Sequence, residues 1–248
     1  MNSGSKRSII VGASSGIGEA IALQLGRDGA DVAIVARRAQ ELDRVKGEIE
    51  KAGGKAHAYV HDVRDYSAVP ALFQKIALDM GGLDLVVYAS GVMPLIEPNE
   101  FCFDKDKQTI ETNCLGAIAW LNEAAQRFEH TGQGTIVGIS SVAADRGRRG
   151  FPVYGASKAF FDTYLEALRN RVGRLGVAVI TIKPGPVDTP MSSGVKKRPL
   201  LISADAAAAA TLRAVSKRKL VVYVPGTWRP IMFIVRHIPS FIFRKLNF

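Results

Sequence analysis

Three elements follow one another in the stretch Ile9-Ile10-Val11-Gly12-Ala13-Ser14-Ser15-Gly16-Ile17-Gly18. The branched apolar residues predict a buried strand over 8–11, and the pattern after the turn predicts a helix over 17–26. Glycine allows the tight turn between them and lets the backbone approach a bound phosphate, which would face the first amides of the helix. The other interpretation is an ordinary strand–turn–helix whose glycines serve only close packing.

The rest of the 248-residue chain repeats this alternation of strand and helix. Further strands are expected over 31–36, 57–61, 83–88, 135–139, 177–182 and 220–224, and helices over 40–52, 67–80 and 107–128. Alternating elements predict one α/β domain, a three-layer, Rossmann-like, doubly wound parallel sheet. We expect this single domain over 1–226, followed by an apolar and basic tail over 227–248 that is not a separate domain.

A tyrosine and a lysine stand four residues apart in Tyr154-Gly155-Ala156-Ser157-Lys158. On a helix this spacing places both side chains on one face. A nearby ammonium favours the phenolate and would lower the tyrosine pKa from about 10 into the range of proton transfer. Ser141, just after the apolar run 135–139, precedes Tyr154 by thirteen residues.

With these motifs in this order, the chain resembles the classical short-chain dehydrogenase/reductase family over about residues 6–191. The resemblance implies an oxidoreductase that interconverts a carbonyl and a secondary alcohol with a nicotinamide cofactor. It implies that Ser141 orients the substrate oxygen and that Tyr154 is the general acid for reduction. Lys158 would lower the tyrosine pKa and bond the nicotinamide ribose, and Asn113 would hold a water that completes a proton relay.

Arg37 and Arg38 follow the second expected strand, where NAD-selective members usually carry an aspartate for the ribose hydroxyls. A guanidinium can pair with a 2′-phosphate, so we expect NADP(H); the alternative is a solvated surface pair. The resemblance implies cofactor contacts from Gly12, Ser14, Ser15, Gly16, Ile17, Gly18, Arg37, Arg38, Asp62, Val63, Ala89, Gly91, Tyr154, Lys158, Pro184, Gly185, Val187 and Thr189. The chain departs from the family at Ala89, where an asparagine is usual.

The loop between Ser141 and Tyr154 carries three arginines, at positions 146, 148 and 149. This loop borders the substrate, and guanidinium groups there suit an anionic substrate such as a phosphate or a carboxylate. Arg148 and Arg149 are the candidate substrate ligands. A solvated basic loop is an equal alternative.

The net charge of +10 lies entirely in the last quarter of the chain. From Thr189 onward, 11 basic residues accompany one acid, Asp205, so the 22 basic and 22 acidic residues before them balance. The tail mixes large apolar side chains with Arg and Lys, which suits a helix lying in the interface of an anionic membrane. The alternatives are packing on the body or on a second subunit, and disorder.

The tail and the loop before Tyr154 also resemble a subgroup of the family, the reductases of the keto-pentose in decaprenylphosphoryl-arabinose synthesis. This resemblance implies a lipid-linked or other amphiphilic keto substrate at a membrane surface. One rival is a soluble reductase of small ketones or 3-oxoacyl thioesters. A rival of another class is a protein that senses NADP on the same fold, but the intact Ser141, Tyr154 and Lys158 argue against it.

Composition narrows the remaining possibilities. Two cysteines, Cys102 and Cys114, give no disulfide framework, which favours a reducing, cytoplasmic location. No Cys/His cluster has ligand spacing, so no metal is expected. No apolar run reaches about 20 residues and no signal peptide is visible, so a membrane span is not expected. The apolar content of the basic tail fits lipid better than nucleic acid, which is not expected as a partner, whereas a homo-oligomer stays open.

Overall fold

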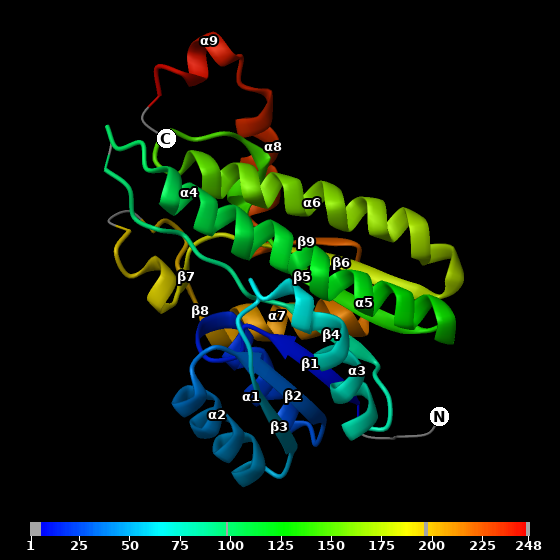
Figure 1. The fold of residues 1–248 in the computed structure, drawn as a ribbon. Helices are drawn as coiled ribbons and strands as arrows, with labels where there is room; N and C mark the ends of the chain where they lie inside the picture. Colours follow the sequence, from blue (N-terminus) through cyan, green and yellow to red (C-terminus); the bar gives the residue numbers. More distant parts are fainter. Residues whose placement is uncertain (1–5, 98, 196–197, 247–248) are drawn as a thin grey trace.

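The computed structural model describes residues 6–97, 99–195 and 198–246. The first five residues and the positions 98, 196, 197, 247 and 248 lie outside the described residues, so the last two positions of the expected tail are not placed. Within the described residues, strands and helices alternate along the chain up to the tail, as the sequence predicts (Figure 1).

One parallel sheet of seven strands organises the molecule, in the order β3-β2-β1-β4-β5-β6-β9. Its strands are β1 (Arg7–Val11), β2 (Asp31–Ala36), β3 (Lys55–Val60), β4 (Leu85–Tyr88), β5 (Gly134–Ile139), β6 (Val177–Pro184) and β9 (Val221–Val224). The order reverses between β1 and β4, which pair directly with Ile9 beside Val86. In open parallel sheets such a switch point lies beneath the ligand crevice at the carboxyl ends of the strands.

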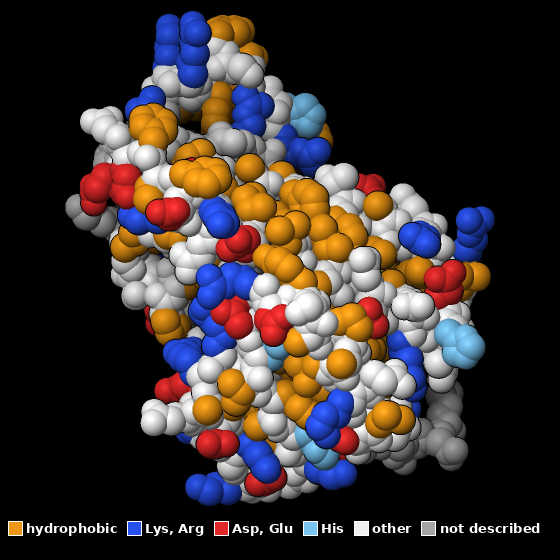
Figure 2. Space-filling view, in the orientation of Figure 1, with side chains coloured by type: hydrophobic (Ala, Val, Ile, Leu, Met, Phe, Trp, Pro, Cys, Tyr) orange, Lys and Arg blue, Asp and Glu red, His pale blue; other side chains and the backbone are white. Residues whose placement is uncertain are grey.

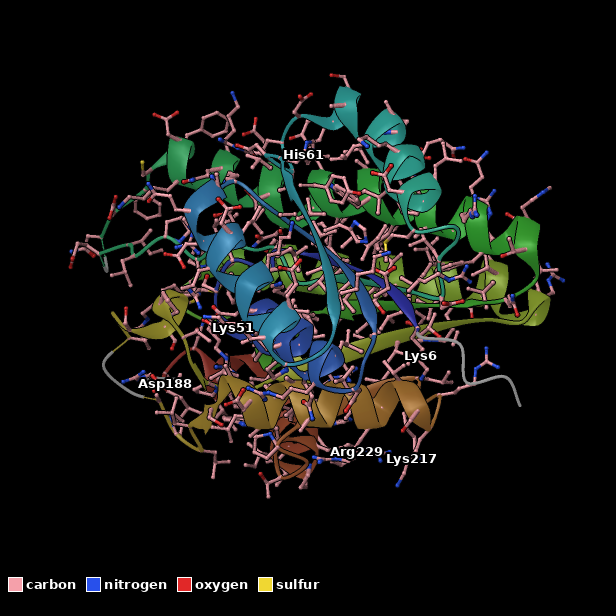
Figure 3. All side chains as sticks on the ribbon, turned by 90° about the horizontal axis from the view of Figure 1, so that it is seen from below. Lys6, Lys51, His61, Asp188, Lys217 and Arg229 are labelled. Atoms are coloured by element: carbon pink, nitrogen blue, oxygen red, sulfur yellow. The ribbon has the colours of Figure 1, made fainter. Side chains whose placement is uncertain are left out.

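Helices cover both faces of the sheet and complete three layers. One face is covered by α1 (Gly16–Arg27), α2 (Ala39–Lys51) and α7 (Ala204–Ser216). The other face is covered by α3 (Val69–Asp79), α5 (Gly116–Thr131) and α6 (Pro152–Val172), with α4 (Phe103–Ile110) beside α6. In Figure 3, seen from below, α7 lies along the lower margin of the picture and the green helices α4 and α5 along the upper one, with the sheet between them; the label Lys51 marks the end of α2, and Lys217 follows α7.

Alternate residues of each central strand supply the two layers of the core. Ile9 packs in the layer of Phe73 and Trp120, whereas its neighbour Ile10 packs in the layer of Ile21. Both isoleucines are fully buried. Strands buried on both faces read as continuous apolar runs, which is why the sequence indicates a parallel sheet.

The helix expected over 107–128 is different in the structure. It begins earlier, as α4, and is interrupted by a π-helical turn over Glu111–Leu115 before α5 continues. A π turn accommodates one extra residue within a helix, and apolar periodicity alone does not reveal it. Other boundaries move less: β3 begins two residues before the expected strand, and α2 ends at Lys51.

The tail folds back onto the body as two helices, α8 (Trp228–His237) and α9 (Ser240–Phe243). Trp228, Met232 and Val235 of α8 are buried and form a small apolar cluster with Val142. Val142 directly follows Ser141, so the tail packs on the loop between Ser141 and Tyr154. Among the described residues, no helix is both long enough and apolar enough to cross a bilayer.

Candidate active site

The carboxyl ends of the central strands surround a cavity of about 690 Å³. It lies over the switch point between β1 and β4, where the fold predicts a ligand site. Most of the residues expected from the sequence line it. They are Gly12, Ser14, Ser15, Gly16, Ile17, Gly18, Arg37, Arg38, Asp62, Val63, Ala89, Gly91, Ser141, Arg148, Tyr154, Lys158, Pro184, Gly185, Val187 and Thr189. Asn113 and Arg149 are not among the lining residues.

The glycine turn brings backbone close to backbone. Gly12 has a φ of +93°, and a Cβ there would lie 2.5 Å from the amide nitrogen of Ser90. A Cβ at Gly18 would collide with the carbonyl oxygen of Gly12, so the first turn of α1 sits directly on the strand end. Only glycine fits either position, and the start of α1 therefore faces the cavity with its free amide groups.

Arg38 is folded over this turn. Its Nη2 donates to the hydroxyl oxygens of Ser14, at 2.9 Å, and Ser15, at 2.8 Å. Arg37 is more exposed, with Nη1 4.0 Å from Oδ2 of Asp62. Two guanidinium groups and two hydroxyls thus gather where β2 ends beside the glycine turn, a donor set that fits a phosphate on the ribose of a dinucleotide.

Ser141 and Tyr154 meet at the cavity wall. Ser141 caps the 3₁₀ turn Val142–Asp145, because its Oγ accepts a hydrogen bond from the amide of Ala143 at 3.0 Å. Tyr154 lies in the first turns of α6, and its hydroxyl group lies beside the Ser141 side chain. The end of β5 and the start of α6 therefore bring the hydroxyl groups of Ser141 and Tyr154 together at the cavity wall.

Lys158 lies one turn further along α6. Its ammonium is buried and donates to the carbonyl oxygen of Ile139 at 2.9 Å, and it lies 5.9 Å from the ring centroid of Tyr154. Burial lowers the pKa of Lys158 to about 8, and the negative charge of Asp162 opposes that shift. At neutral pH the ammonium keeps its proton.

The expected lowering of the Tyr154 pKa is not found. Burial raises the pKa of Tyr154, and the neighbouring Ser141 side chain only partly offsets this, since it favours the phenolate. The physical reason is that Lys158 donates to the Ile139 carbonyl instead of the phenol oxygen. A raised tyrosine pKa keeps the proton on the hydroxyl, which is the form needed by a general acid.

Asn113 lies inside the π-helical turn and holds it against the neighbouring strand end. Its Nδ2 donates to the carbonyl of Val92 and to the hydroxyl of Ser157, both at 3.0 Å, and its Oδ1 accepts from the Val92 amide at 2.8 Å. A Cβ at Gly91 would lie 3.4 Å from Asn113 Oδ1 and 3.6 Å from Lys158 Nζ. The amide is therefore close to the lysine, but both of its N–H groups are used by protein atoms. Its role in holding a water stays a prediction.

The turn after β6 lies across the cavity from the glycine turn. Thr189 approaches that turn, since a Cβ at Gly16 would lie 3.0 Å from its Cγ2. Val187 is buried in a two-stranded sheet formed by β7 (Val187–Asp188) and β8 (Ile202–Ser203). A Cβ at Gly185 would collide with the Trp228 indole, so α8 determines the shape of this turn.

The two candidate substrate arginines lie in different places. Arg148 is mostly buried and lines the cavity, and burial lowers its pKa. One of its N–H groups also points at the sulfur of Met232, with Nη2 3.7 Å from Sδ. Arg149 is more exposed and donates from Nη2 to the carbonyl oxygen of Arg244 at 3.3 Å. Arg148 can thus reach a bound molecule, whereas Arg149 contacts the tail.

Two features of the site are absent from the sequence-based expectations. Trp228 lines the cavity, although the sequence indicates only that it begins a basic apolar tail. A buried ion cluster lies behind the catalytic residues: Lys183 Nζ contacts Asp145 and lies 2.6 Å from Oδ2 of Asp162. The hydroxyl of Tyr223 donates to Asp145 at 2.9 Å. The sequence places Lys183 in the turn after the sixth strand. No local sequence pattern indicates that it contacts Asp145 and Asp162.

In the described contacts, neither His57 nor His61 meets Ser141, Tyr154 or Lys158. His57 lies 2.9 Å from Oδ1 of Asp31 on the edge of the sheet. His61, labelled in Figure 3, is buried with its ring edge-on to Trp120 at a centroid distance of 5.6 Å. It lines the cavity beside Asp62, and burial lowers its pKa.

Known proteins resemble the chain over most of its length. The family model described as short chain dehydrogenase matches residues 6–199. The chain is 30% identical over 239 residues to an oxidoreductase of Mycobacterium tuberculosis described as uncharacterised, and the match covers 96% of each protein. It is 34% identical over 188 residues to another such oxidoreductase, from Myxococcus xanthus, with 76% of this chain and 74% of the relative covered. The glycine betaine reductase of Emericella nidulans is 35% identical over 187 residues, but the match spans only 14% of its length.

Solved structures share the architecture. A short-chain dehydrogenase from Sphingobium yanoikuyae in complex with NADPH superposes with a TM-score of 0.82 at 23% identity, covering 95% of this chain and 97% of that one. A variant of actinorhodin polyketide ketoreductase with NADPH has a TM-score of 0.81 at 24% identity, with coverage of 89% and 95%. At these identities the likeness establishes the fold, the three-layer parallel sheet expected from the sequence.

Proposed function

Because the chain belongs to the short-chain dehydrogenase/reductase family, an oxidoreductase family acting on CH–OH and C=O groups, we propose that it reduces a carbonyl to a secondary alcohol with NADPH. One observation carries the proposal. The hydroxyl groups of Ser141 and Tyr154 lie beside each other at the wall of the same cavity that the glycine turn lines. Reduction needs a proton donor and a cofactor pocket in one enclosure, and this cavity offers a candidate for each, which supports the proposal.

The chain's own residues have distinct tasks in this reaction. NADPH, when bound in this cavity, would supply the hydride for the carbonyl carbon. Ser141 donates a hydrogen bond to the carbonyl oxygen and fixes its position, which stabilises the charge that develops there. Tyr154 gives its proton to that oxygen. Lys158 donates to the Ile139 carbonyl while Tyr154 is protonated. In the proposed step its ammonium would stabilise the phenolate that Tyr154 becomes, and Asn113 keeps the π turn next to this lysine.

The cofactor preference rests on the charges around the glycine turn. Arg38 already bridges Ser14 and Ser15, and Arg37 lies beside Asp62, so a 2′-phosphate would find two guanidinium groups and two hydroxyls. A bare ribose diol would offer no negative charge to Arg38, whose partners in the described contacts are neutral groups of Ser14 and Ser15. This arrangement supports NADP(H) over NAD(H).

The substrate is proposed to be an amphiphilic ketone, such as a keto-sugar linked to a polyprenyl phosphate. Two features support this: Arg148 places a cation at the cavity wall, and the tail combines basic and apolar residues next to that wall. Such a substrate would bring the enzyme to the cytoplasmic face of a membrane as a peripheral protein. The alternative is a soluble reductase of small ketones or 3-oxoacyl thioesters, with the tail serving a homo-oligomer contact.

Turnover of NADPH is the direct test. The loss of reduced nicotinamide absorbance would be followed with a panel of water-soluble ketones, 3-oxoacyl thioesters and polyprenyl-phosphate keto-sugars. Turnover with any carbonyl that Tyr154→Phe abolishes supports the reductase. NADPH binding without turnover of any carbonyl or alcohol would favour a protein that senses NADP.

A further inference from the structure

The part of the tail that the structure describes, residues 227–246, has a buried face and an exposed face. The inner face of α8 carries Trp228, Met232 and Val235, all buried against the body. The outer face carries Phe233 and Ile234, which are 65% and 64% exposed. A helix that buries one apolar stripe and leaves a second one in water has an unpartnered surface.

The exposed apolar surface continues through α9. Phe241 is 62% exposed, and Ile242 and Leu246 are also exposed. Figure 2 shows apolar and basic side chains together at the top of the molecule, where Figure 1 places α8 and α9. The outer face is thus defined by Phe233, Ile234, Phe241, Ile242 and Leu246.

The charge on this surface has one sign. Arg229, Arg236, Arg244 and Lys245 are exposed, and residues 227–248 contain no Asp or Glu. Apolar side chains surrounded by cations match the surface of an anionic bilayer, where chains and headgroups satisfy both. A second copy packing the same face against itself would bring like charges together, because a two-fold interface uses one patch twice.

A different surface suits a second copy better. Phe101, Phe103 and Phe160 are exposed on or beside α4 and α6, and Figure 2 shows apolar side chains gathered over these helices. Asp104 and Lys105 alternate there, so the charge is mixed. Oligomer packing therefore does not require the outer face of the tail.

The inner side of the tail is bonded to the catalytic loop. Arg146 donates from Nη1 to the carbonyl of Arg236, at 3.0 Å, and from Nη2 to the hydroxyl of Ser240, at 3.3 Å. Its guanidinium carbon lies 4.6 Å from the ring centroid of Phe243. Arg149 adds its bond to the Arg244 carbonyl. Both arginines lie between Ser141 and Tyr154, so the corner between α8 and α9 is held by the loop that carries the catalytic serine.

We propose that the outer face of the tail docks on an anionic lipid surface, and that docking steadies the catalytic loop so that turnover is higher on the membrane. The regulation rests on the reductase function proposed above, whereas the docking stands without it. In this proposal the lipid binds the folded-back tail, because the ordered α8 separates its exposed apolar side chains from those buried against the body. Binding thereby favours the state in which Arg146 and Arg149 are engaged.

The docking is tested by co-sedimentation of the full-length protein with vesicles of phosphatidylcholine and phosphatidylglycerol in equal parts. The wild type is expected to bind, more weakly at high salt, and Phe233→Glu/Ile234→Glu to weaken binding at least about ten-fold. Leu78→Glu is the matched control, since Leu78 is an exposed apolar residue of α3, 69% exposed and away from the tail. It should bind like the wild type.

The coupling is tested with a water-soluble ketone and NADPH, with and without the same vesicles. Vesicles should raise wild-type turnover several-fold, Phe233→Glu/Ile234→Glu should keep only its rate without vesicles, and Arg146→Ala should bind vesicles without the increase. Vesicle binding by the wild type with unchanged turnover would contradict the coupling.

Equal vesicle binding by Phe233→Glu/Ile234→Glu and the wild type would contradict the proposed docking face. A size-exclusion shift showing that this double variant dissociates a dimer would contradict it as well. An absence of turnover with every carbonyl refutes the reductase function instead, since sedimentation is read independently of it.

Discussion

Lys183 joins the end of β6 to the helix that carries the catalytic tyrosine and lysine, because its Nζ lies 2.6 Å from Oδ2 of Asp162. Asp162 is one helical turn beyond Lys158, and the same ammonium contacts Asp145 at the end of the turn that follows Ser141. One buried cation between two carboxylates therefore connects the end of β6, helix α6 and the turn after Ser141, the three segments that carry or adjoin the proposed catalytic residues. The cluster leaves one net negative charge near Lys158.

Replacing Lys183 by Met should destabilise the protein strongly. Two buried carboxylates would lose their counter-charge, which typically costs about 3–5 kcal/mol in the free energy of unfolding. Burial already raises the pKa of Asp162, so the variant should lose less stability at acid pH, where this carboxyl takes up a proton in the folded state. Urea unfolding at neutral and acid pH measures the difference. Lys46→Met, which removes an exposed pair with Glu50, is the control and should have little effect. Equal stability of the two variants would contradict the role of the cluster.

Removing the Tyr154 hydroxyl should abolish reduction without abolishing cofactor binding. A positioned general acid contributes about 10²–10⁴-fold to the rate, and Phe keeps the packing of the ring. Initial rates of NADPH oxidation and a fluorescence titration of bound NADPH separate the two effects. Tyr164→Phe is the matched control on the same helix, because its hydroxyl donates only to Asn122, at 2.9 Å, in the described contacts. Undiminished turnover in Tyr154→Phe would assign the proton to another group.

Arg38→Leu should change the cofactor preference. The variant loses the guanidinium that bridges Ser14 and Ser15, and a hydrogen bond to a charged group is worth about 1.5–3 kcal/mol, or about ten- to a hundred-fold in KM for NADPH. The KM for NADH should change little, since NADH has no 2′-phosphate. Arg44→Leu removes a cation that pairs with Glu19 on the same side of the molecule and should leave the ratio unchanged. A parallel rise of both KM values in Arg38→Leu would mean that the residue only supports the turn.

The rate of reduction should fall as the pH rises through about 8. Burial lowers the pKa of Lys158 to about 8, so above that pH the ammonium that stabilises the phenolate is lost. Asp162 is the first group opposing this shift, ahead of the Cys114 thiol on the adjacent π turn, so Asp162→Asn should move the alkaline limb to lower pH. Glu166→Gln, one further turn along α6, should not. A limb at the same pH in both variants would show that Lys158 does not set it.

The lowered pKa of Lys158 also predicts how its contribution to the free energy of unfolding depends on pH. The folded pKa of Lys158 lies below its ordinary value of 10.5, so between about pH 8 and 10.5 the unfolded chain binds more protons than the folded one. By linkage, the contribution of Lys158 to the free energy of unfolding increases with pH across this window. The pH dependence of activity and that of this contribution therefore have opposite signs.

The edge of the sheet that carries the candidate site could be predicted from the sequence, because the sequence patterns that indicate it involve residues close together in the chain. Gly12 and Gly18 mark a turn that excludes any Cβ, and apolar runs mark strands buried on both faces. The four-residue spacing of Tyr154 and Lys158 follows from helix geometry alone. The fold and the lining of the cavity were accessible for the same reason.

The position of the tail was not predictable in the same way. Trp228 packs on Gly185, more than forty residues earlier, and the partners of Arg146 in the tail include a backbone carbonyl that has no signature in the sequence. The sequence left membrane contact and packing on the body as alternatives for the whole tail. In the structure the inner face of α8 packs on the body and its outer face is exposed. The two alternatives are compatible, because opposite sides of one helix can contact different partners.

The π-helical turn sets the rotational phase between α4 and α5. α4 contacts α6, whereas α5 buries Trp120 and Phe128 in the core, and one extra residue within Glu111–Leu115 lets each segment keep its own contact face. Loss of a single residue there would restore regular winding and rotate one segment against the other by about 100°. Asn113 would then turn away from Val92 and Ser157. The length of this short turn, and not only its composition, is thus a constraint on how the chain can evolve.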